Sequence, residues 1–181
     1  MFILWVFLII FTGSNQKKMT MKAKQTNKIG HIEVDDVYVT VLTGRLETNE
    51  EGWQKVVPTD RSQRMTGSMI INAVVKILME TSIRRTEQMA ALLEVDALEL
   101  THAVHLLTGL SLQEFILGYR NRQAVEYVQC TSLSLDEIAS RCGFQSTNTF
   151  VKQFRIHTGM PPRQYRVIHQ PEDFRQRYRW E

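Results

Sequence analysis

Three side chains in the carboxyl-terminal third of the sequence have the types and spacing to contact a nucleic acid. Asn148, Lys152 and Arg155 share one face of a helix that would begin after Ser146. This face offers amide, ammonium and guanidinium donors, which read base edges and bind phosphates in the major groove. Two residues flank it, Thr147 and Val151. An ordinary solvent-exposed helix presents a similar face, and the spacing alone does not separate the two interpretations.

The residues before this helix are typical of a helix-turn-helix unit. Ala139 is small where two helices would cross closely, and Gly143 allows the left-handed backbone that ends the first helix. Phe144 has the size to fill the corner between the helices, and Ser146 is a favourable cap for the second. We expect the inward face of the second helix to consist of Phe150, Phe154 and His157.

The same unit occurs a second time, fifty residues earlier. Thr108-Gly109 matches Thr158-Gly159 at this shift. Three apolar positions match in the same way: Leu100 with Phe150, Val104 with Phe154, and Phe115 with Tyr165. One residue of slippage aligns Met89-Ala90 with Ile138-Ala139. The repeat predicts two helix-turn-helix units, joined by a long helix over residues 112–129.

Apolar periodicity and cap residues predict seven helices with short connections between residues 68 and 168. Their expected bounds are Met69–Glu80, 87–93, 97–109, 112–129, 135–143, 147–159 and 162–166. The expected caps are Ser68 or Gly67 for the first helix, and Thr86, Asp96, Ser111, Ser134 and Ser146 for the next five. The expected fold class is therefore all-α, a seven-helix double helix-turn-helix domain with a short β-like amino-terminal extension.

The extension before this domain contains two strand-like segments. Val34–Leu42 is rich in β-branched residues, and its alternation places Val37, Val39 and Val41 on one face. Gly44 and Asn49–Gly52 predict turns, and Trp53–Val57 predicts a second short strand. Thr59–Gly67 is expected to be a polar linker. We therefore expect four segments: 1–18, 19–67, the helical domain 68–168, and a basic aromatic tail 169–181.

The two ends of the chain leave alternatives open. Met1–Phe11 is an apolar run that is too short to span a membrane as a helix. It is compatible with a start codon placed too early, with Met19 or Met21 as the true start, with a hydrophobic tail or membrane tether, and with an export signal. The tail Phe174–Trp180 carries three Arg and three aromatic residues, which suit either a brace on a DNA backbone or a cap on the core.

Composition excludes several classes of protein. The chain has 181 residues and a formal net charge of +3, with ordinary globular hydrophobicity. Its two cysteines, Cys130 and Cys142, lack the spacing of a zinc or redox site, so we expect buried thiols in a reducing cytoplasm. The chain contains no phosphate-binding loop, nucleophile elbow or zinc-protease motif, so we expect neither an enzyme nor a cofactor. His102 and His105 lack a third metal ligand, and we expect no metal site.

The second unit resembles the DNA-binding domain of the AraC/XylS family of bacterial transcription regulators. The matching residues are Leu135-Asp136-Glu137-Ile138-Ala139, Cys142-Gly143-Phe144, Ser146, Phe150, Phe154-Arg155, His157-Thr158-Gly159, Pro162 and Tyr165-Arg166. Arg120 and Ala124 match a further pattern in the linking helix. The resemblance implies two helix-turn-helix units that insert recognition helices into successive major-groove faces.

Expected DNA contacts follow from the resemblance. In the second unit they are Thr147, Asn148, Val151 and Lys152, joined on the same helix by Ser146, Thr149 and Arg155. In the first unit they are Leu98, Thr101 and His102. The resemblance implies double-stranded DNA as a partner, and RNA polymerase if the protein is an activator. The segment 19–67, about 50 residues before Ser68, is too short for the family's effector-binding domain, so no small-molecule pocket is expected.

The first unit departs from the family pattern, which usually has a bulky aromatic at Val104 and basic residues near His102. Between Thr86 and Glu114 there are five acids and no Lys or Arg, whereas residues 139–171 contain five Lys or Arg and no acid. Because phosphate contacts supply much of DNA affinity, we expect the second unit to dominate binding. The expected function is a sequence-specific, cytoplasmic DNA-binding regulator without a full effector domain. The alternative is a protein-interaction or membrane-tethered adaptor with weak DNA binding.

Overall fold

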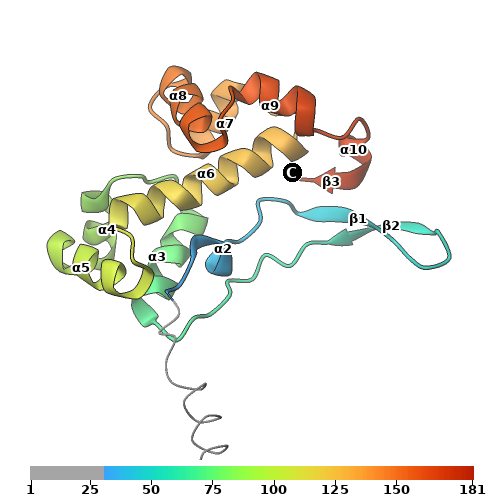
Figure 1. The fold of residues 1–181 in the computed structure, drawn as a ribbon. Helices are drawn as coiled ribbons and strands as arrows, with labels where there is room; N and C mark the ends of the chain where they lie inside the picture. Colours follow the sequence, from blue (N-terminus) through green and yellow to red (C-terminus); the bar gives the residue numbers. More distant parts are fainter. Residues whose placement is uncertain (1–30) are drawn as a thin grey trace, which may run out of the picture. The chain divides into compact units, whose positions relative to one another are not determined.

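The computed structural model describes residues 31–181, so the expectations for residues 1–18 lie outside the described part. Ile32–Glu181 form one compact unit. Its elements are α2 (Val34–Val37), β1 (Gly44–Thr48), β2 (Gln54–Pro58), α3 (Met69–Glu80), α4 (Thr86–Leu93), α5 (Ala97–Thr108), α6 (Leu112–Cys130), α7 (Leu135–Arg141), α8 (Thr147–Thr158), α9 (Pro162–His169), α10 (Phe174–Arg177) and β3 (Tyr178–Arg179) (Figure 1). Within this part of the chain, no helix combines the length and apolar character needed to cross a membrane.

The seven predicted helices are confirmed as α3 to α9. Ser68, Ser134 and Ser146 each accept a hydrogen bond from the backbone amide three residues later, which satisfies one donor of the first helical turn. Ser111 and Glu114 form a complete capping box at the start of α6. At the start of α5, the Asp96 carboxylate accepts hydrogen bonds from two backbone amides, as a cap does. The cap predicted for α4 is wrong, because Thr86 is the first residue of that helix and Arg85 occupies the cap position.

The repeat extends into the connections between the helices. Thr81 and Thr131 directly follow α3 and α6, and each hydroxyl donates to the carbonyl four residues earlier, at 2.7 and 2.6 Å. Thr108 and Thr158 make the same bond at the ends of α5 and α8, at 2.8 Å in both. The first unit therefore comprises α3 to α6 and the second α6 to α9, with α6 shared between them.

The shared helix divides the core into two clusters. The first half of α6 contributes Phe115 and Ile116 to a cluster with α3, α4 and α5. The second half contributes Ala124 and Val128 to a cluster with α7 and α8. Figure 1 shows α6 running between the two groups of helices, so one rigid helix fixes both units.

Both cysteines are free and buried, as expected. Burial raises the pKa of the Cys142 thiol to about 12, and burial also raises the pKa of Cys130 to about 12. Both thiols are therefore protonated at neutral pH.

The strand predicted for Val34–Leu42 is wrong. Val34–Val37 is a helical turn, and residues 38–43 run on outside any strand. The predicted alternation is nevertheless present, because Val37, Val39 and Val41 are all buried. The segment therefore packs on its apolar side chains, without a neighbouring strand.

One carboxylate takes the place of that missing strand. Glu126 of α6 accepts from the Tyr38 hydroxyl at 2.5 Å, the Thr40 hydroxyl at 2.6 Å and the Val41 amide at 2.9 Å. Buried polar groups need partners, and here a long-range side chain supplies them. Such a partner is 85 or more residues away in the chain, which a local pattern cannot indicate.

The sheet lies elsewhere than predicted. Gly44, expected in a turn, begins β1, while the second predicted strand is present as β2. These strands form a hairpin, and β3 from the tail pairs with the other edge of β1. Trp180 packs against the second core cluster. Of the two roles considered for the tail, the structure shows the packing role.

Candidate nucleic-acid interface

Helix α8 is the element that carries the predicted contact residues of the second unit. Its cap is Ser146, and it ends at Gly159, whose φ of 82° is the left-handed conformation that glycine adopts easily. Phe150 and Phe154 anchor it in the core, and their rings meet edge to face at 5.6 Å. The opposite face of α8 is therefore held outward.

The predicted contact residues of α8 lie mostly on that outward face. Asn148, Thr149, Lys152 and Arg155 are exposed, as is the cap Ser146. Neither cation of this face takes part in the ion pairs found among residues 31–181. Their charges are therefore available to an external anion.

Two further predicted contacts are half-buried. The Thr147 hydroxyl donates to the Asp136 carboxylate of α7, and Val151 packs against the second core cluster. These two residues lie at the border between the outward face and the core. They can touch a base only by their outer edges.

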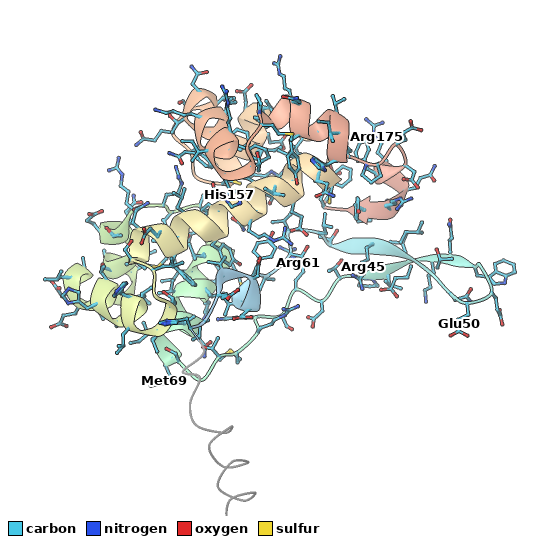
Figure 2. The ribbon with its side chains drawn as sticks, in the orientation of Figure 1. Arg45, Glu50, Arg61, Met69, His157 and Arg175 are labelled. Carbon is cyan, nitrogen blue, oxygen red and sulfur yellow. The ribbon has the colours of Figure 1, made fainter. Side chains whose placement is uncertain are left out.

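The prediction that His157 faces the interior is wrong, because its side chain is exposed on α8 (Figure 2). Phe154 is the last residue of α8 in the second core cluster. The second core cluster therefore does not extend to the final turn of α8, which carries His157.

The corresponding face of α5 is chemically different. Leu98 is 63% exposed and His102 is also exposed. The Thr101 hydroxyl is half-buried and donates to the Ala97 carbonyl at 2.7 Å, which leaves its oxygen only as an acceptor. The structure thus presents a leucine and an imidazole where α8 presents an amide and an ammonium.

Two polar clamps hold the helix-turn-helix units in place. Arg120 is almost fully buried, and its guanidinium donates to the carbonyls of Leu78, Thr81 and Ile83, at 2.9, 2.5 and 3.2 Å. In the second unit two residues capture the three equivalent carbonyls. Arg166 donates to Val128 and Leu133, and Gln170 donates to Thr131. The family pattern pointed to Arg120 and Arg166, but nothing in the sequence predicted this task.

A cavity lies on each side of α8. One, of about 580 Å³, lies toward the starts of α7 and α9 and is lined by Asn148, Val151 and Arg163 among others. The other, of about 630 Å³, lies between the start of α8 and the connection that precedes α4. A helix in the major groove has a sugar-phosphate strand on each side, so hollows on both flanks suit that position.

The second of these cavities is lined by residues that were not predicted as contacts from the sequence. They are Arg84, Arg85, Gln88 and Gln145, and of the predicted contacts only Thr149 joins them. The adjacent arginines directly before Thr86 were the available signal. They directly precede the segment Thr86–Glu114, which contains no Lys or Arg.

Comparisons with known proteins agree with this geometry. The family described as "Helix-turn-helix domain" matches residues 89–167. The HTH-type transcriptional activator RhaR of Cronobacter sakazakii is 37% identical over 59 residues, which is 33% of this chain and 21% of RhaR. The RhaR of an Escherichia coli O139:H28 strain is 30% identical over 66 residues, or 36% of this chain and 23% of that protein. The matched part thus spans less than a quarter of these relatives.

Solved structures share the fold. The C-terminal domain of AraT, a response regulator from Geobacillus stearothermophilus, superposes with a TM-score of 0.54 and 27% identity, covering 59% of this chain and 90% of that one. The DNA-binding domain of the transcription factor AdpA, solved with a target DNA, gives 0.51 and 26%, covering 55% and 90%. The helices α3 to α9 of this chain therefore form a double helix-turn-helix domain similar to the DNA-binding domains of AraC-type regulators.

Proposed function

We propose that this protein is a sequence-specific transcription regulator that binds double-stranded DNA through α8 and, more weakly, through α5. The supporting observation is the outward face of α8, whose amide, ammonium and guanidinium groups have no ion-pair partner in the described residues. The shared fold with the AdpA domain, solved with its target DNA, favours the same ligand here.

The side chains of α8 have distinct proposed tasks. Asn148 and Lys152 would read base edges, because an amide pairs well with adenine and an ammonium with guanine. Arg155, one turn further along, would bind phosphate or guanine. Ser146 and Thr149 would hold the backbone near the start of the helix, and Thr147 and Val151 would contribute only edge contacts.

The first unit would contribute differently. Leu98 suits contact with a thymine methyl group, Thr101 can accept a hydrogen bond, and His102 can donate one. Without Lys or Arg on α4 or α5, this unit would hold the backbone less firmly. If the protein activates transcription, we propose RNA polymerase as its second partner.

The experiment is the selection of bound duplexes from a random DNA pool, followed by a salt titration of the selected site. A regulator should bind with a steep inverse dependence on salt. Lys152→Ala should cost about 1–3 kcal/mol of binding free energy if Lys152 reads a base, and about one unit of salt slope if it binds phosphate. An adaptor would enrich no sequence, and Lys152→Ala would then leave both quantities unchanged.

A further inference from the structure

The cavity of about 630 Å³ beside α8 is lined by residues of both helix-turn-helix units. Its wall from the first unit is the connection Ser82–Arg85 together with Gln88 of α4. Its wall from the second unit is the turn at Gly143 and Gln145 together with Thr149 of α8. Its lining includes two guanidinium groups, several amides and hydroxyls, and no Asp or Glu. Donors without a carboxylate favour an anionic ligand.

The wall between the units is built by direct contacts. The Arg84 guanidinium lies 3.8 Å from the centroid of the Phe144 ring, a cation–π contact that links the two units. The Ser82 hydroxyl donates to the Arg141 carbonyl at 3.2 Å. At Gly143, any Cβ would lie 1.8 Å from the Ser82 carbonyl oxygen, so the two backbone segments approach as closely as glycine permits. The cavity is therefore preformed.

The two arginines of this cavity have charges and a hydrogen-bond donor that are not paired within the described residues. Among the described residues neither Arg84 nor Arg85 forms an ion pair, and the buried Arg84 Nε has no hydrogen-bond partner there. Arg84 is half-buried and Arg85 is exposed. A buried guanidinium nitrogen without a partner is costly, and a bound oxygen ligand would satisfy it.

The position of the cavity identifies the ligand as DNA backbone. It opens beside Thr149, on the flank of α8, and continues to the start of α4 in the other unit. A duplex held by both recognition helices must carry its sugar-phosphate strand past this point, since the helices enter successive major-groove segments. We propose that the cavity seats phosphates of the strand between the two recognition helices, with Arg85 and Arg84 as cationic ligands and Gln88 and Gln145 as neutral donors. This inference rests on the proposed function.

The proposal also changes the account of the first unit. No Lys or Arg occurs from Thr86 to Glu114, so α4 and α5 carry no cationic anchor for phosphate. Arg84 and Arg85 stand immediately before α4 and supply that anchor from the connection between α3 and α4. The anchor would act on any sequence, because phosphates carry no base identity.

The test measures salt dependence with a duplex of mixed sequence about 30 base pairs long, nearly three helical turns. Arg85→Gln is the main variant, because Arg85 is exposed and its replacement should not disturb folding. Arg84→Gln and the double variant extend the series, with melting temperatures recorded because Arg84 packs on Phe144. Lys55→Gln on β2 is the matched control. Lys55 is exposed, loses the same charge, and forms no ion pair among residues 31–181.

We expect the slope of log affinity against log salt to become shallower by about 0.9 for Arg85→Gln and by about twice that for the double variant. The loss should be equal on selected and unrelated duplexes, and Lys55→Gln should keep the wild-type slope. An unchanged slope in Arg85→Gln and the double variant, beside a shallower one in Lys152→Ala, overturns the cavity proposal alone. An equal loss in Lys55→Gln also overturns it, since net charge would then explain the effect. Binding by the wild type without salt dependence overturns both this proposal and the proposed function.

Discussion

In the first helix-turn-helix unit, Glu94 follows α4. In the second unit, Gly143 occupies the corresponding position after α7. Both residues have left-handed backbone, with φ of 56° and 72°. The side chain of glutamate therefore fits a turn in one unit that only glycine fits in the other. The difference lies in the surroundings, because Gly143 faces the Ser82 carbonyl of the other unit.

The recognition helices differ in the same way. Lys152 of α8 corresponds to His102 of α5, Arg155 to His105, and Asn148 to Leu98. The buried side of each helix keeps apolar residues, but the exposed side carries a lysine and an arginine in α8 and two histidines in α5. The comparison teaches that a repeated backbone constrains the interior of each unit and leaves the outer surface free to diverge.

The largest expected effect breaks the symmetry of the two turns. Gly143→Ala should cost about 4 kcal/mol or more of unfolding free energy, since it combines a left-handed L-residue with a clash against backbone. Glu94→Ala should change stability by less than about 0.5 kcal/mol, because an exposed side chain already occupies that backbone conformation. Urea unfolding of both variants measures the two values. Equal costs would mean that the contact with Ser82 is unimportant.

The next effect compares the two core positions under the recognition helices. Phe154 is 2% exposed and meets both Phe150 and Tyr165 edge to face. Phe154→Ala should therefore cost about 3–5 kcal/mol. Val104→Ala, at the matching position of the first unit, should cost roughly 2 kcal/mol, because it removes fewer buried carbons. Thermal unfolding gives both values, and an unaltered melting temperature with lost DNA binding would instead make Phe154 a contact residue.

The third effect measures how unevenly the units bind DNA. Lys152→Ala/Arg155→Ala should weaken binding to the selected site by more than about 1–3 kcal/mol at pH 7.5, because it removes two exposed cations. Thr101→Ala/His102→Ala should cost less at that pH, because it removes no permanent positive charge. Binding titrations of both double variants at pH 7.5, with melting curves as the folding control, provide the comparison. Equal losses at pH 7.5 would contradict the asymmetric interpretation.

The smallest effect concerns a thiol that only the second unit contains, at the position of Leu93 in the first. The folded pKa of Cys142, about 12, is raised above its ordinary value of 9.0. The unfolded chain therefore loses its proton first, and this thiol's contribution to stability declines as pH rises from about 9 to about 12.

Cys142→Ala should accordingly lose less stability than the wild type between pH 8 and pH 10, by about 1.4 kcal/mol. Chemical unfolding at these two pH values measures the difference. Cys130→Ala is the companion variant, because the pKa of that thiol is raised by burial in the same direction. Parallel pH curves for wild type and Cys142→Ala would show that this thiol does not titrate differently on unfolding.

The sequence by itself determined the seven helices, the repeat and the predicted helix caps other than Thr86. These features depend on local physics, because Ser68, Ser134 and Ser146 each bond an amide three residues away. The inward positions Phe150 and Phe154 were readable from helical periodicity for the same reason. His157 was predicted wrongly, because periodicity gives a direction but not the extent of the core beneath it.

Only the tertiary structure decided the features that join distant segments. The segment 38–42, predicted as part of a strand, is held on α6 by hydrogen bonds to the Glu126 carboxylate. The carboxyl-terminal tail supplies the third strand of the sheet. The cavity between the units depends on Arg84 reaching Phe144, sixty residues later in the chain. A local pattern fixes which residues a helix exposes, whereas long-range packing fixes what each exposed residue then faces.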